Sequence, residues 1–275
     1  MIELQFSSIE ELEINPWPAI YHIEIKGLVF SVYFDPVKNS KCMNVFSPGY
    51  LDRNSYEHPY FQRMKWLDEL EGSGLIITDP TLSLHRDIGI AWFQGSKKRF
   101  AIFDIAKIVE RFRNYLTLKN ENVLFFGSSA GGFASMMLAA LMKGSCCVVN
   151  NPQTDIFEFR EPFLSDMLNR CYSGLDYLDI SNSYLPRFSV SEFMLVNRNI
   201  PKCIYLQNVS DKEHYEKHFL PFIGKIGEMS SGNDSLELSN LTVRLYKDEV
   251  AGHNPAVLKF IKPYIEVAQK ELLIS

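Results

Sequence analysis

A short apolar strand within residues 122–126 runs directly into a Gly-x-Ser-x-Gly turn at 127–131 and then into a helix rich in Ala, Met and Leu. A residue at the apex of so tight a turn takes a strained, usually positive-φ conformation, and the positions two before and two after it must be nearly bare. Ser129 has Gly127 and Gly131 at those positions, whereas Ser128 has a phenylalanine on one side. The pattern is that of a nucleophile elbow and predicts that Ser129 is a nucleophile.

The helix after the turn is expected to contribute to the chemistry. Its first amides point at the serine oxygen, so the N–H of Ala130 is predicted to donate to an oxyanion, with the helix dipole adding to the effect. Two phosphate-binding alternatives fail on the residues: a P-loop needs a lysine after Gly132, where Phe133 stands, and the dinucleotide fingerprint breaks at Ser129. A Ser/Gly turn without chemistry is the alternative that the motif alone leaves open.

The composition limits the classes of protein to which this chain can belong. With 275 residues, 46% of them hydrophobic, it can bury a large core as one α/β domain over residues 1–275 with an insertion. The net charge is −5 and the charges are mixed along the chain, so no basic surface predicts nucleic-acid binding. The longest apolar run, residues 136–142, is too short for a transmembrane segment. The acidic N-terminus lacks the pattern of a secretion signal, and we expect a soluble, cytoplasmic protein.

The cysteines fit the same expectation. Their number is odd, most of them lie in apolar strand-like runs, and none has Cys-x-x-Cys spacing. We therefore expect small buried hydrophobic residues in a reducing compartment rather than metal or redox ligands. They are Cys42, Cys146, Cys147, Cys171 and Cys203.

Strands and helices alternate along most of the chain, which predicts a mostly parallel sheet covered on both faces. The first two strands are expected to pair antiparallel at a sheet edge around Gly27. Over residues 152–200 the alternation gives way to aromatics, prolines and short helical pieces, which predicts a cap-like insertion that shapes a substrate pocket. The expected strands are residues 19–26, 27–34, 42–47, 74–78, the elbow strand within 122–126, 146–150, 202–208 and 241–246, with a further short extended piece at 89–93. The expected helices are 61–70, 101–117, 213–227 and 255–272, with a Ser/Gly/Asn-rich loop at 230–240.

A serine nucleophile needs a histidine to take its proton, and in this topology the histidine comes last, after an acid. Among the six histidines, His253 alone follows the last expected strand, in a glycine-containing loop before the final helix. His214 and His218 lie one helical turn apart and invite a zinc interpretation. We do not favour it, because the Glu of the metalloprotease pattern and a third ligand are both missing.

The acid is predicted to be Asp211, which follows the strand at 202–208 and opens the next helix. Capping that helix is the alternative role for this residue. Asp155, after the strand at 146–150, is the second candidate. Asp248 and Glu249 would have to fold back onto the histidine from its own loop.

A second oxyanion donor is expected from the loop after the strand at 42–47. The N–H of Gly49 or of Tyr50 is the candidate, because Ser-Pro-Gly lets the backbone approach the elbow closely. An ordinary Pro-Gly turn would give the same sequence.

The order Ser129, Asp211, His253 and the elbow sequence resemble the α/β-hydrolase superfamily, over nearly the whole chain from about residue 19. A narrower resemblance is to bacterial surface-polysaccharide proteins of that superfamily, among them capsule O-acetyltransferases and the acetyltransferases of the accessory secretion pathway. The segments that carry it are 47–49, 60–63, 79–82, Trp92 with Gly95, 127–135, 151–155, Asn208 with Asp211 and His214, and 252–253.

The resemblance implies the α/β-hydrolase fold and an acyl-enzyme on Ser129, with His253 as base and then acid and Asp211 as its orienter. It also implies acetyl-CoA as an acyl donor to a sugar hydroxyl, and glycan-assembly proteins as partners. The chain departs from many esterases of the superfamily because it lacks a His-Gly-Gly-Gly oxyanion loop.

Three functions remain open on the sequence. The first two, acetyl transfer to a carbohydrate and hydrolysis of a small ester, use the same residues and differ in whether water reaches the acyl-enzyme and whether CoA has a site. Residues 97–99, Lys-Lys-Arg, could meet CoA phosphates, although a solvated loop is the simpler interpretation. The third is a non-catalytic scaffold in glycan assembly, since fold does not fix function.

Overall fold

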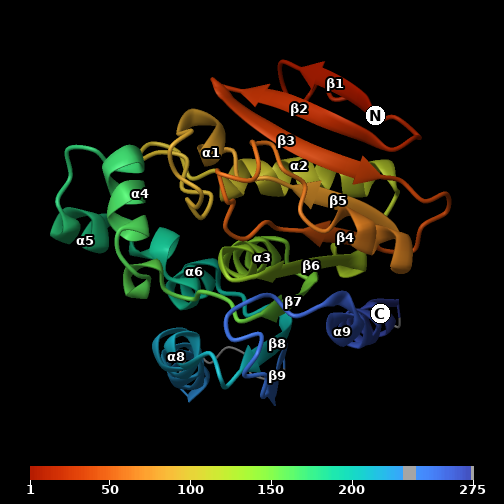
Figure 1. Cartoon of the computed structure of the whole chain (residues 1–275). Coiled ribbons are helices and arrows are strands. Elements are labelled where there is room, and N and C mark those ends of the chain that lie inside the picture. The colour runs from red at the N-terminus through yellow and green to blue at the C-terminus, as the bar shows by residue number, and fades with distance from the viewer. Residues whose placement is uncertain (232–239, 274–275) are drawn as a thin grey trace.

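The computed structural model describes residues 1–231 and 240–273. The predicted Ser/Gly/Asn-rich loop falls mostly at residues 232–239, which lie outside the described residues. Within them, a nine-stranded sheet in the order β1-β2-β3-β5-β4-β6-β7-β8-β9 forms the centre of the molecule (Figure 1). The strands are β1 (Ile2–Phe6), β2 (Ala19–Ile25), β3 (Leu28–Asp35), β4 (Met43–Phe46), β5 (Ser73–Ile77), β6 (Val123–Ser128), β7 (Cys146–Asn150), β8 (Lys202–Asn208) and β9 (Leu241–Tyr246).

The expected mostly parallel sheet is confirmed. β3 runs antiparallel to its neighbours β2 and β5, and the other neighbouring strands in the described chain pair in parallel. The antiparallel pairing of β2 with β3 is as predicted, but the pair does not form the edge. β1 adds a parallel strand outside β2, with Leu4 opposite Tyr21. Its alternating apolar residues, Ile-Glu-Leu-Gln-Phe, are the signal that the sequence interpretation missed.

Two further expectations are wrong. Residues 89–93 do not form a strand, because Trp92 and Phe93 take positive φ angles of 49° and 58° that end any extended run. Their apolar character reflects burial in the core instead. The helix expected at 61–70 is only the 3₁₀ helix η1 (Met64–Glu69), which starts after Arg63 in the left-handed region.

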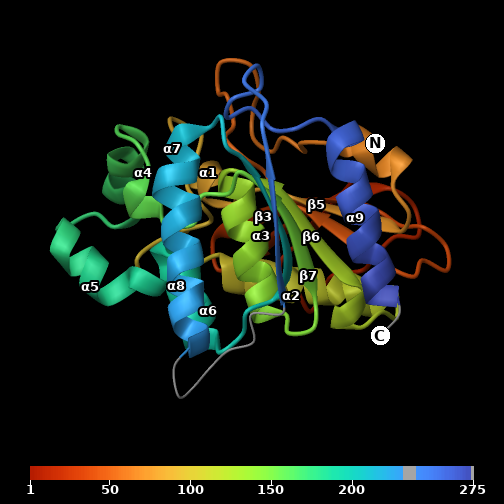
Figure 2. The same cartoon turned by 90° about the horizontal axis from the view of Figure 1, so that it is seen from below.

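Helices cover both faces of the sheet (Figure 2). Side chains of α2, α3, α6 and α8 pack into a large apolar cluster on one face, and those of α9 and η1 into a smaller one on the other. The helices are α1 (Thr81–Leu84), α2 (Ile102–Tyr115), η2 (Asn120–Asn122), α3 (Ala130–Leu141), η3 (Ile156–Glu158), α4 (Phe163–Cys171), α5 (Tyr177–Phe188), α6 (Val190–Asn197), α7 (Lys212–His214), the π-helical turn η4 (Tyr215–Phe219), α8 (Leu220–Ser231) and α9 (Leu258–Leu273).

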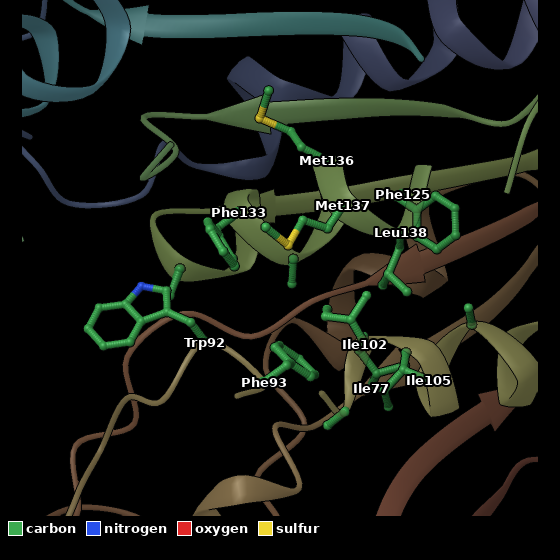
Figure 3. Close-up of a cluster of buried hydrophobic side chains, with 14 of the residues drawn as sticks. Ile77, Trp92, Phe93, Ile102, Ile105, Phe125, Phe133, Met136, Met137 and Leu138 are labelled. Atoms are coloured by element: carbon green, nitrogen blue, oxygen red, sulfur yellow. The ribbon is translucent and has the colours of Figure 1, made fainter. Parts of the chain in front are cut away.

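The helix that follows the elbow lies in the middle of the larger cluster. Residues 130–140 of α3 are all buried, as expected for a helix that is apolar all round. Phe133 and Met137 from α3 belong to this core, together with Phe125 of β6 and Ile102 of α2 (Figure 3). The elbow is therefore held between a buried strand and a buried helix, which fixes its position tightly.

Residues 152–200 contain η3, α4, α5 and α6. Figure 1 shows α4 and α5 to one side of the sheet, with α6 nearer to α3. The backbone N–H of Lys97 donates to Cys171 O at 2.8 Å, and Arg187 donates to Ser96 O, so the segment is hydrogen-bonded to the rest of the chain at more than one point. Its role as a cap over the substrate stays a prediction.

Candidate active site

The elbow has the strained geometry that its sequence predicts. Ser129 has φ 54° and ψ −123°, a conformation that costs a non-glycine residue about 1–3 kcal/mol and persists only when the surroundings enforce it. A Cβ on Gly127 would lie 2.1 Å from Gly131 O, and one on Gly131 would lie 2.5 Å from Ser47 O. The glycines are thus required by close approach of backbone to backbone.

Ser129, His253 and Asp211 form one hydrogen-bonded chain. His253 Nε2 lies 3.1 Å from Ser129 Oγ, and His253 Nδ1 lies 2.8 Å from Asp211 Oδ2. The three residues are far apart in the sequence and meet at the carboxyl ends of β6, β8 and β9. The arrangement can move a proton from the serine hydroxyl to an imidazole whose far side is oriented by a carboxylate.

One buried side chain fastens the loops that carry the acid and the histidine. Asn208, the last residue of β8, accepts hydrogen bonds on Oδ1 from the N–H groups of Ser210 and Asp248. Its Nδ2 donates to the carbonyls of Asp248 and Gly252. Both loops are therefore hydrogen-bonded to the same side chain, and His253 is the residue directly after Gly252.

Asp211 has two roles that the sequence presented as alternatives. Its Oδ1 accepts from His214 N at 3.4 Å, so it caps α7, while Oδ2 accepts from His253. Burial acts to raise the pKa of Asp211, but the hydrogen bonds from His214 and His253 outweigh burial and hold this pKa well below its usual value. The carboxylate is therefore ionised at neutral pH.

The other acids considered lie elsewhere. Asp155 caps η3 by accepting from Phe157 N at 3.0 Å, and burial raises its pKa. Asp248 accepts from the amides of its own loop, and Glu249 pairs with Lys247 on the surface. Among the described residues these acids make no hydrogen bond to His253, whereas Asp211 does.

Two more histidines pack in a row next to His253. The His214 ring stacks on the His253 ring with centroids 3.9 Å apart, and its Nδ1 lies 3.2 Å from Asp211 Oδ2. His218 is buried next to His214, at 4.9 Å between centroids. Burial lowers the pKa of His214, and it lowers the pKa of His218 to about 3. Both rings are therefore neutral at neutral pH.

The contacts of this cluster give little support to a metal site. Asp211, His214 and His253 have ligand atoms within 4.8 Å of one another in the described chain. The carboxylate, however, already accepts from both rings, and His218 is not among the three. The hydrogen-bonded arrangement accounts for all of these atoms without an ion.

The predicted oxyanion donors differ in their availability. The N–H of Ala130 is the first amide of α3, so it has no acceptor within the helix. The N–H of Gly49 already donates to Gln62 Oε1 at 3.0 Å. Gln62 Nε2 in turn donates to Tyr50 O, so one side chain holds both residues of this loop. No hydrogen bond from the Tyr50 N–H to a described residue is seen.

Arg63 connects this loop to the elbow. Its Nη2 donates to Ser128 Oγ at 2.6 Å, and its Nη1 lies 3.3 Å from Gln62 Oε1. The guanidinium stacks over Trp66 and has no carboxylate partner among the residues described. Burial lowers the pKa of Arg63 to about 10, so it stays charged at neutral pH.

A residue from the segment predicted to be an insertion contacts Ser129. Gln153 Nε2 donates to Ser129 Oγ at 3.0 Å, and Gln153 Oε1 accepts from Trp92 Nε1 at 2.5 Å. Both Gln153 and Trp92 are almost fully buried. Ser129 Oγ is thus contacted by an imidazole and by an amide.

Comparison with known proteins supports the architecture. No protein-family model matches the chain, and no curated protein matches it in sequence. Among solved structures, the capsule O-acetyltransferase of Neisseria meningitidis serogroup A is similar over 90% of this chain and 96% of its own, at 12% identity and a TM-score of 0.62. An S-formylglutathione hydrolase from Agrobacterium tumefaciens is similar over 94% and 98%, at 14% identity and a TM-score of 0.59.

The chain has the α/β-hydrolase fold. The Gap123 glycosylation-associated complex of Streptococcus agalactiae is also similar, over 91% of this chain but only 46% of that one, at 13% identity and a TM-score of 0.63. This chain therefore spans about half the length of that relative. At such identities the likeness concerns the fold alone, and the site has to be judged on its own geometry.

The sequence interpretation missed three contacts around Ser129 and its neighbouring loops. Gln153 and His214 lie in segments quoted for the resemblance but received no role, and Gln62 was not considered as a partner of Gly49. The contacts of Gln153 and Gln62 are hydrogen bonds between residues far apart in the chain, which leave no periodic pattern, whereas His214 lies only three residues after Asp211. A buried polar residue just after a strand at the elbow edge is the signal that could have found Gln153.

Proposed function

We propose that this protein catalyses acyl transfer through an acyl-enzyme on Ser129, and that its reaction is O-acetylation of a carbohydrate hydroxyl with acetyl-CoA as donor. The observation that carries the proposal is the unbroken chain from Ser129 Oγ through His253 to Asp211, at 3.1 and 2.8 Å. A serine hydroxyl is a poor nucleophile unless such a base takes its proton.

In the first half-reaction Ser129 Oγ attacks the thioester carbonyl while its proton moves to His253 Nε2. The carbonyl π electrons move onto the oxygen, and the N–H of Ala130 is placed to stabilise this oxyanion. Collapse breaks the C–S bond, and His253 returns the proton to the CoA sulfur. Asp211 stays ionised and stabilises the imidazolium in between.

In the second half-reaction a sugar hydroxyl gives its proton to His253 and attacks the acetyl carbon. The Ser129 ester bond then breaks, and the serine recovers its proton from His253. Water in place of the sugar would give ester hydrolysis with the same residues. Among the similar structures are an enzyme of each kind, and the acetyltransferase has also been solved with CoA bound.

The location and partners are part of the proposal. All five cysteines are buried and free, which suits a reducing cytoplasm. In the described chain no helix combines the length and apolarity needed to cross a bilayer. Of the basic residues proposed to meet CoA phosphates, Lys97 donates to Ser173 O and Arg99 pairs with Asp104, so these two are already engaged. Glycan-assembly proteins are proposed partners.

A covalent probe tests the nucleophile first. We expect a serine-directed fluorophosphonate to add one adduct to the wild-type protein, detected by intact mass, and none to Ser129→Ala. Absence of an adduct on folded wild-type protein would favour the scaffold function. Acetyl-CoA turnover with and without capsule oligosaccharides, against p-nitrophenyl acetate hydrolysis, then separates transferase from esterase. Hydrolysis that no sugar diverts would point to an esterase.

A further inference from the structure

The loop after β7 returns directly to the elbow. Asn151 has φ 43° and turns the chain, and its side chain accepts from Asn208 N at 2.7 Å. Pro152 then packs on Gly132, where a Cβ would lie 2.5 Å from the proline ring. The backbone N–H of Gln153 donates to Ser129 O at 3.2 Å. Gln153 is therefore attached to the nucleophile by its backbone as well as by its side chain.

The orientation of the Gln153 amide is set by its neighbour. An indole Nε1 can only donate, so the Gln153 atom that faces Trp92 must be Oε1. Nε2, with its two N–H groups, then faces Ser129 Oγ. Trp92 is itself fixed, since the adjacent Phe93 N donates to the buried carboxylate of Asp79 at 2.8 Å.

Gln153 Nε2 can donate two hydrogen bonds, of which the described residues accept one. One N–H donates to Ser129 Oγ, and the other has no acceptor among the residues that the structure describes. The N–H of Gly49, expected at this position, is engaged with Gln62. The oxyanion of a tetrahedral intermediate is bonded to the same carbon as Oγ, so it forms next to the Gln153 amide.

We propose that the side-chain amide of Gln153 is the second oxyanion donor of this enzyme, acting with the N–H of Ala130 and oriented by Trp92. This rests on the proposed function. As Ser129 Oγ bonds to the carbonyl carbon and loses its proton to His253, the second N–H of the amide donates to the new oxyanion. A buried donor is effective there because it is already oriented.

Gln153→Met is the first test, because methionine keeps the volume and removes the amide. We expect the rate constant for acylation by p-nitrophenyl acetate to fall roughly 100- to 1,000-fold, with KM changed little. A trifluoromethyl ketone, which adds to Ser129 as a tetrahedral anion, should lose affinity by a similar factor. A merely structural glutamine would not single out the tetrahedral state.

Gln94→Met is the matched control. Gln94 is equally buried and bonds to Tyr172 and Arg187 through its amide, but it does not contact Ser129. We expect it to keep acylation within a few-fold of wild type. Gln153→Glu keeps the acceptor for Trp92 and replaces the donor by an oxygen, so it is read in place of the Met variant if circular dichroism shows that variant unfolded.

The outcomes separate the two proposals. If Gln153→Met and Gln153→Glu acylate as fast as wild type, or if Gln94→Met loses as much as Gln153→Met, the assignment of Gln153 is overturned while the serine chemistry stands. If the wild-type protein neither hydrolyses the ester nor takes up fluorophosphonate, the proposed function itself is wrong, and the role of Gln153 falls with it.

Discussion

Ser129 Oγ is contacted by two groups of residues, called here the histidine side and the amide side, and the two groups differ in structure. On the histidine side, His253 and Asp211 come from loops after β9 and β8 and are backed by the neutral ring of His214. On the amide side, Gln153 comes from the loop after β7 and depends on Trp92, far away in the sequence. In the proposed mechanism the histidine side moves protons, whereas the amide side offers only fixed dipoles.

The two sides also differ in whether they can be recognised from the sequence. Proton transfer demands particular residue types in a particular chain order, so the histidine side shows in the sequence. A hydrogen-bond donor can come from any amide, backbone or side chain, so the amide side shows only when distant loops are placed. The following predictions are ordered from the largest expected effect to the smallest.

Asp211→Asn should break the histidine side. Asparagine keeps the shape but can hold His253 in the wrong tautomer, so we expect kcat to fall by roughly 10³- to 10⁴-fold. The control is Asp155→Asn, which alters only the cap of η3 and should stay within a few-fold of wild type. Equal losses in both variants would contradict the assignment of the acid.

The buried histidines should make folding sensitive to acid. Because the folded-state pKa of His218 is lowered to about 3, the unfolded chain binds this proton first as the pH falls. The contribution of His218 to the free energy of unfolding should therefore fall as the pH drops below about 6.5, by about 1.4 kcal/mol per unit at most, and level off near pH 3. Urea unfolding between pH 7 and 5 measures it, with a loss of about 2 kcal/mol.

His218→Gln isolates this effect. Glutamine does not titrate and can still accept from Thr154 N, as His218 Nδ1 does at 3.4 Å. The slope of unfolding free energy against pH should be shallower in this variant, and His214 accounts for part of what remains. A slope identical to that of wild type would show that His218 is protonated equally in both states.

His214→Phe should weaken the histidine side without removing it. Phenylalanine keeps a ring against His253 but loses the hydrogen bond to Asp211. A hydrogen bond to a charged group contributes about 1.5 kcal/mol or more, so we expect kcat/KM to fall about tenfold. The pH profile should shift as well, because Asp211 loses one of its partners. An unchanged rate and profile would leave His214 with a packing role only.

Gln62→Ala should have the smallest effect, and it tests which group on the amide side donates to the oxyanion. It frees the N–H of Gly49 and loosens Tyr50, and with Gln153 as the oxyanion donor we expect less than about a fivefold change in acylation rate. A rate increase would instead indicate that the freed Gly49 amide stabilises the oxyanion. A loss as large as that of Gln153→Met would assign the oxyanion side to this loop.

The sequence by itself determined the elbow, the parallel sheet and the residues that could serve as base and acid. These follow from local rules: bare positions two residues either side of Ser129, apolar periodicity, and the chain order of the loops. The bounds of β7, β8 and β9 match the expected strands for the same reason. Local rules also produced the errors, because the apolar run at 89–93 is buried without being extended.

Only the tertiary structure decided which groups meet at Ser129. It selected Asp211 over Asp155, occupied the N–H of Gly49 with Gln62, and brought Gln153 to the nucleophile. Hydrogen-bond partners are chosen by distance and burial in three dimensions, and residues many positions apart leave no joint pattern in the chain. Residue types and chain order were therefore enough to name the candidate residues, while their geometry depended on packing between loops.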